Sequence, residues 1–181
     1  HRQGDSNGAL RQYQQFLKIA LPQLGFSHQD VAFTFKCIAQ IHHQRGDKEA
    51  AVHVYHQALR SCESALGSYH AEVASILNKL GNLQFDLGYY NAAFDMYQRG
   101  LLVERAVFEE NHPNIIVTLS NIAQVHKQRG DFEAAFGLYA AIYIAQVSSV
   151  GFRHPKVALT LSNMALMYYQ SKKYAPALEL Y

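Results

Sequence analysis

The chain has 181 residues, of which 49% are hydrophobic and 17% are charged, and its formal net charge at pH 7 is +2. The apolar content is ample for a continuous core. The near-neutral charge, without any lysine- or arginine-rich run, argues against nucleic acid as the partner. No stretch of about 18 consecutive apolar residues is present, so the sequence predicts no membrane span.

Read from the amino terminus, the chain predicts helices that alternate with short turns. Residues 4–24 have the pattern of the second helix of a preceding repeat. We expect residues 1–181 to form a single array that is a piece of a longer protein. The expected helix pairs lie at about 28–65, 70–107, 112–149 and 154–181, the last of them incomplete.

The pairs recur at a constant interval. Residues 46–55 read GDKEAAVHVY, and residues 130–139 read GDFEAAFGLY. A fixed period of about 20–50 residues is typical of a solenoid, in which like units stack and shield one another's apolar faces. The sequence therefore predicts an all-α solenoid of antiparallel helix pairs. The tyrosines that end each copy are 42 residues apart, at Tyr13, Tyr55, Tyr97, Tyr139 and Tyr181.

Turn residues separate the two helices of each pair. Gly46, Gly88 and Gly130 stand where each first helix should end, because glycine readily adopts the left-handed conformation that closes a helix. Asp47 and Asp131 follow directly. We expect their carboxylates to cap the next helix by accepting backbone N–H groups.

A histidine precedes each first helix, and Pro113 and Pro155 follow two of them, where a missing N–H costs little. A zinc site needs three or four ligands that converge, whereas these histidines are spread along the stack. We therefore expect them to stabilise turns or cap helices, and we expect no metal and no cofactor. The histidines are His28, His70, His112 and His154.

Cys37 and Cys62 are the two cysteines, and they form no framework of paired spacings. This usage favours a reducing compartment, so we expect a cytoplasmic location. Both thiols are expected to act as small apolar groups.

The repeated side chains resemble a known family. Ile122, Ala123, Gly130, Ala135 and Tyr139 match the spacing of the tetratricopeptide repeat signature, here in a 42-residue unit. The resemblance implies a tetratricopeptide-repeat superhelix, an α-solenoid with a concave groove lined by the first helix of each pair. It also implies a scaffold or adaptor that binds proteins.

The long unit is similar to the kinesin light chain class of this family. The segment LSNIA at residues 119–123, with its counterpart LSNMA at residues 161–165, has the character of that class. So do the pairs His112-Pro113 and His154-Pro155.

Carrying over the groove positions of the family gives a candidate peptide-binding site that is amide-rich and mildly basic. Asparagine and glutamine can pair with the backbone of an extended peptide, and the lysines would favour an acidic one. Polar residues would also be found there simply because an open groove faces water. The candidate residues are Phe33, Lys36, Gln40, Asn78, Lys79, Asn82, Phe85, Ser120, Asn121, Gln124, Lys127, Asn163, Leu166 and Tyr169.

The sequence contains no phosphate-binding GxxxxGK[ST] loop and no GxSxG nucleophile motif, so we expect no enzymatic activity in this segment. The expected partner is a protein or a linear, acidic peptide. Two other functions stay open. The array could be a structural or oligomerisation module that self-associates, or a regulatory repeat segment of a larger enzyme or signalling protein.

Overall fold

The computed structural model describes residues 2–180, with side chains described from residue 6 to residue 178. Within these residues the protein is all-α and contains no strand, which confirms the predicted fold class. The helices begin and end close to the expected ranges. They are α1 (Arg2–Leu24), α2 (Gln29–Gln44), α3 (Lys48–Leu66), α4 (Ala71–Asp86), α5 (Tyr90–Val107), α6 (Pro113–Arg129), α7 (Phe132–Val150), α8 (Pro155–Gln170) and α9 (Tyr174–Leu180).

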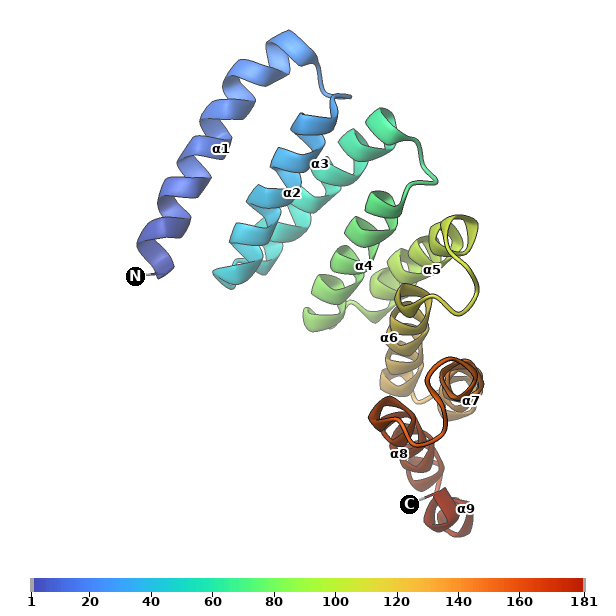
Figure 1. Cartoon of the computed structure of the whole chain (residues 1–181). Coiled ribbons are helices and arrows are strands. Elements are labelled where there is room, and N and C mark those ends of the chain that lie inside the picture. The colour runs from blue at the N-terminus through green and yellow to red at the C-terminus, as the bar shows by residue number, and fades with distance from the viewer. Residues whose placement is uncertain (1, 181) are drawn as a thin grey trace. The chain divides into compact units, whose positions relative to one another are not determined.

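The chain divides into two compact units, His1–Val107 and Phe108–Tyr181, which we call unit 1 and unit 2. In unit 1, α2 packs against α3 and α4 against α5 as antiparallel pairs, and α3 joins the two pairs by packing on α4 (Figure 1). In unit 2, α6 pairs with α7, and α8 packs on both α7 and α9. No helix in the described part of the chain is both long enough and apolar enough to cross a bilayer.

The histidines that precede the first helices are caps, as predicted. In each of the four, Nδ1 accepts a hydrogen bond of 3.1–3.2 Å from the backbone N–H two residues further on. This bond satisfies one of the donors that the first helical turn leaves without a partner. It requires Nδ1 to be unprotonated. Pro113 and Pro155 occupy the start of their helices, as expected.

The predicted capping role of Asp47 and Asp131 is wrong. Both residues stand at the N-cap position, but neither side chain accepts a backbone N–H. Their ψ angles of 69° and 63° depart from the extended conformation of the histidine caps, at ψ 138–143°. The carboxylates instead face the preceding helix, with Oδ2 at 3.6 Å from His42 Nδ1 and at 3.5 Å from His126 Nδ1.

The repeated tyrosines are buried in the core, and one of them packs against a glycine. Tyr55 and Tyr97 are 0% and 2% exposed, and Tyr139 is 2% exposed. At Gly81, which stands where the other full repeats have alanine, a Cβ atom would lie only 2.5 Å from Cε1 of Tyr97. Because atoms cannot approach that closely, Gly81 permits the depth at which the ring of Tyr97 is buried.

The Gly81→Ala substitution should therefore lower stability, by about 1–2 kcal/mol, because overpacking outweighs the gain in helix propensity. The matched control is Gly137→Ala on α7, where a Cβ meets nothing within 4 Å. That substitution should stabilise the protein by about 0.5–1 kcal/mol. Denaturant midpoints of both variants provide the measurement. Equal stabilisation by the two would show that the ring of Tyr97 shifts without cost.

The His154→Ala substitution should cost about 1 kcal/mol, since the N–H of Lys156 would lose its acceptor. His154→Asn should keep the stability within about 0.5 kcal/mol, because asparagine is a strong N-cap residue. Urea denaturation of the whole chain, compared between the two variants and the wild type, provides the measurement. If the two variants were equally destabilised, the role of His154 would lie elsewhere than in its acceptor atom.

Candidate functional site

The candidate residues predicted from the sequence lie on α2, α4, α6 and α8, and none of them is buried. Phe33, Asn82, Gln124 and Tyr169 are exposed, and the others are half-buried. Each unit brings some of these residues together in a pocket. The unit 1 pocket is formed by α2, α3 and α4, and the unit 2 pocket by α6, α7 and α8.

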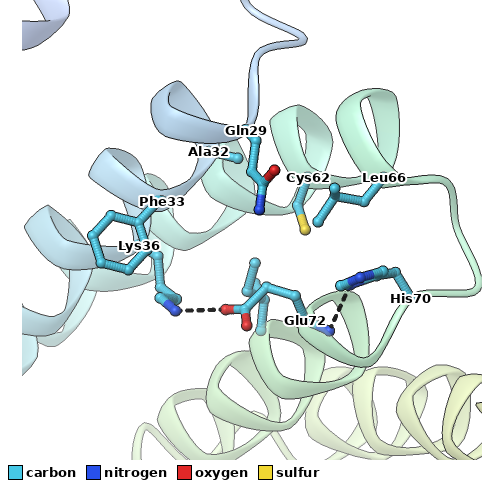
Figure 2. Close-up of a pocket in the computed structure, with 9 residues that line it drawn as sticks. Gln29, Ala32, Phe33, Lys36, Cys62, Leu66, His70 and Glu72 are labelled. Atoms are coloured by element: carbon cyan, nitrogen blue, oxygen red, sulfur yellow. Dashed lines mark hydrogen bonds and ion pairs between the residues drawn. The ribbon is translucent and has the colours of Figure 1, made fainter.

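The unit 1 pocket has a volume of about 190 Å³. Across its mouth, Lys36 Nζ lies 2.6 Å from Glu72 Oε1 and 4.9 Å from the centre of the Phe33 ring (Figure 2). Cys62 lies at the inner wall, and burial raises the pKa of its thiol to about 11. The lining residues are Gln29, Ala32, Phe33, Lys36, Cys62, Leu66, His70, Glu72 and Ile76.

The unit 2 pocket is larger, with a volume of about 380 Å³. Its floor contains a hydrogen bond of 2.8 Å from Thr160 Oγ1 to Gln146 Oε1, and both of these side chains are buried. Val117 and Leu159 stand at its edge, 56% and 65% exposed. The lining residues are Asn111, Pro113, Ile116, Val117, Ser120, Tyr139, Ile142, Gln146, Ser149, Val150, Lys156, Leu159, Thr160 and Asn163.

The two pockets occupy the same position of the repeat. Adding two repeat lengths to a residue of the unit 1 pocket gives, in nearly every case, a residue of the unit 2 pocket. The backbone that forms the pocket is therefore repeated, whereas the side chains that fill it differ. The corresponding residues include Phe33 and Val117, Lys36 and Ser120, Cys62 and Gln146, Leu66 and Val150, Glu72 and Lys156, and Ile76 and Thr160.

Two predicted residues of α4 are tied to neighbouring helix α5. Asn78 Nδ2 donates to Glu104 Oε1 at 2.7 Å, and Glu104 is only 1% exposed. Asn82 Oδ1 accepts a hydrogen bond of 2.6 Å from the hydroxyl of Tyr97. These amides hold α4 against α5, in addition to any contact that they make with a partner.

The other predicted residues lie outside the two pockets. Phe85 packs on Tyr90 with ring centres 5.3 Å apart, and Tyr169 packs in the same way on Tyr174, at 5.6 Å. Lys79 has no carboxylate at ion-pair distance among the described side chains. The remaining members, which line neither of these pockets, are Gln40, Asn121, Gln124, Lys127 and Leu166.

The sequence-based site missed the residues that close each pocket from the second helix and from the next first helix. Cys62 and Gln146 come from the ends of α3 and α7, and Glu72 and Lys156 come from the first turns of α4 and α8. Residues that are separated by whole 42-residue repeats occupy equivalent positions. A comparison of every helix end at that spacing could therefore have identified these residues from the sequence. No three His, Cys, Asp or Glu side chains of the described residues are placed to hold a metal ion.

Comparison with known proteins finds the same kind of repeat. Family profiles described as tetratricopeptide repeat match residues 30–103 and 72–143, and another with that description matches residues 157–181. No curated protein matches the chain by sequence.

Solved structures share the fold at low sequence identity. Nearly identical TPR-like repeats ascribed to a kinesin light chain of Podosopora anserina superpose with a TM-score of 0.83, at 17% identity, over 99% of this chain and 85% of that chain. BtubC (BKLC) from P. vanneervenii has a TM-score of 0.72 at 19% identity, over 97% and 70%. The MamA protein has a TM-score of 0.68 at 17% identity, over 99% and 80%.

Tyr55 and Tyr97 should respond differently to loss of the hydroxyl. Burial raises the pKa of both, that of Tyr55 to about 12. The hydroxyl of Tyr55 is buried without a hydrogen-bond partner in the described part of the chain, whereas that of Tyr97 donates to Asn82. Tyr97→Phe should cost about 1 kcal/mol, and Tyr55→Phe should be neutral or stabilising.

Guanidinium denaturation of the two variants provides the measurement. If Tyr55→Phe lowered the free energy of unfolding as much as Tyr97→Phe does, the hydrogen bond from Tyr97 to Asn82 would contribute no stability of its own.

Proposed function

Because the chain belongs to the tetratricopeptide repeat family, we propose that it is a protein-interaction scaffold that binds linear peptide segments on α2, α4, α6 and α8. One observation carries the proposal. A pocket recurs at the same repeat position in both units. Side chains that the packing of the core does not require lie at its border. Exposed polar and apolar residues on a rigid scaffold are typical of a binding surface.

The chemistry of these helices suits an extended peptide. Amides such as Gln124 and Asn163 offer both donors and acceptors, which an extended backbone can use in place of water. Lys79 and Lys156, which have no carboxylate at ion-pair distance among the described side chains, favour an acidic segment. Phe33, Val117 and Leu159 offer exposed apolar contact.

We propose binding rather than catalysis as the role of this segment. Cys62 lines the unit 1 pocket, and with its pKa raised to about 11 its thiol stays protonated near neutral pH. A protonated thiol is a poor nucleophile. Cys37 and Cys62 are free cysteines, which supports a reducing compartment such as the cytoplasm.

The experiment that tests the proposal measures binding of acidic, extended peptides to the wild-type chain, Lys79→Glu and Asn121→Ala. Charge reversal should weaken binding about tenfold, and loss of the amide should weaken it about threefold. Lys18→Glu on α1 and Gln98→Ala on α5 are matched controls at exposed positions on other helices, and they should bind like the wild type.

Fluorescence anisotropy with labelled peptides gives the affinities, and circular dichroism checks that every variant is folded. Equal binding by the control variants and by the two α4 and α6 variants would exclude these helices as the binding surface. A concentration-dependent dimer that binds no peptide would instead support the oligomerisation module.

A further inference from the structure

The two pockets have the same backbone frame but opposite arrangements of charge. In the unit 1 pocket the first helix provides a cation, Lys36, and the next first helix provides an acid, Glu72. In the unit 2 pocket the corresponding residues are the neutral Ser120 and the cation Lys156. The repeat has thus produced two versions of one site that should select different ligands.

The unit 1 pocket already contains a carboxylate of its own chain. Glu72 Oε1 lies 2.6 Å from Lys36 Nζ, and the two side chains are 36% and 17% exposed. Figure 2 shows this pair joined across the space between two helices, while Cys62 and Leu66 come from a third helix that lines the same pocket. A ligand carboxylate that approached Lys36 would have to displace Glu72 and would be repelled by it.

The unit 2 pocket has no such internal partner. Lys156 is the one ionised side chain of its lining, and it has no carboxylate at ion-pair distance among the described side chains. On the floor, the carboxamide oxygen of Gln146 is engaged by Thr160, while no acceptor for Gln146 Nε2 is found in the described part of the protein. A cation and an amide donor are therefore both available to an acceptor group of a ligand.

The walls of the unit 2 pocket are aliphatic. Ile116 and Ile142 line its interior, and Val117 and Leu159 are more than half exposed at its edge. Burying such surface is favourable by about 25 cal/mol for each Å² that leaves contact with water. The pocket thus combines an apolar cavity with a neighbouring positive charge.

We propose that the unit 2 pocket is the acid-selective site of this protein, and that Glu72 acts in the unit 1 pocket as a built-in substitute for a ligand carboxylate. The occupant of the unit 2 pocket is an extended segment of a protein partner. It places an aliphatic or aromatic side chain among Ile116, Ile142 and Leu159 and an adjacent carboxylate on Lys156. The unit 1 pocket accepts apolar groups without a charge. This inference rests on the proposed function and assigns the charge preference of each pocket.

The assignment follows from charge complementarity and from burial. The ammonium group of Lys156 favours a carboxylate through a charge-assisted hydrogen bond, and the neighbouring Ile116 and Leu159 favour the burial of an apolar side chain beside it. The same reasoning predicts that removal of the Glu72 charge opens a second acidic site. Lys36 would then lack a carboxylate partner, with Phe33 beside it in the role of Val117.

The experiment is isothermal titration calorimetry of the chain with a short synthetic peptide in which leucine and aspartate alternate. Matched peptides replace every aspartate by asparagine or every leucine by alanine. The wild-type chain should bind one acidic peptide, and both replacements should weaken binding about tenfold. Lys156→Glu should also weaken it at least tenfold, whereas Lys18→Glu on α1 should have no effect.

Glu72→Gln should raise the stoichiometry from one peptide to two. The double variant Lys36→Gln/Glu72→Gln should return it to one, because it lacks the released cation. Circular dichroism shows whether the loss of the Lys36–Glu72 pair has affected folding, and the double variant provides the folding control, since it lacks the same pair.

Several results would overturn the inference. Unchanged affinity of Lys156→Glu for a peptide that the wild type binds would refute the acid-selective pocket while leaving the scaffold function intact. A stoichiometry of two for the wild type, or of one for Glu72→Gln, would refute the role of Glu72. Octanoate that binds as tightly as the peptide and competes with it would identify a small-molecule site. If the wild type bound none of the three peptides, the proposed function would fail together with the inference.

Discussion

The structure depends on one packing constraint, the burial of a large tyrosine ring against a position that carries almost no side chain. Tyr55, Tyr97 and Tyr139 are nearly completely buried, and Gly81 on α4 leaves the space that the ring of Tyr97 fills. Close approach of the helices allows each ring to fill the space between them without leaving a void. Because the tyrosines recur every 42 residues, the same constraint applies to each helix pair.

A repeated backbone provides equivalent pockets, and substitutions within them can diversify their chemistry at little cost to the fold. The unit 1 and unit 2 pockets illustrate this separation. The buried positions of Tyr55, Tyr97 and Tyr139 carry the same residue in each copy, whereas the pocket positions vary between Lys36 and Ser120 and between Glu72 and Lys156. In a solenoid, where each repeat contacts its neighbours alone, such changes remain local. Specificity can thus be tuned one pocket at a time.

The helices, the fold class and the histidine caps were predictable because they depend on local spacing. A residue such as His70 caps α4 through a bond to the N–H just two residues away, and the sequence alone fixes that distance. The aspartates of the other turn, Asp47 and Asp131, were predicted wrongly, because the ψ angle of a turn residue depends on how the preceding helix closes. Side-chain pairs that join different repeats were not predictable either. Lys36 was expected to be available to a peptide, whereas Glu72 on another helix already neutralises it.

The candidate site was therefore foreseen as a set of helix faces but not as pockets, since a pocket needs three elements whose side chains converge. The most direct test of the central claim is methyl NMR of the chain during titration with an acidic, leucine-containing peptide. Binding in the unit 2 pocket should shift the methyl signals of Ile116, Ile142 and Leu159. Shifts confined to exposed methyl groups of the second helices, such as Leu102 and Ile144, would contradict it.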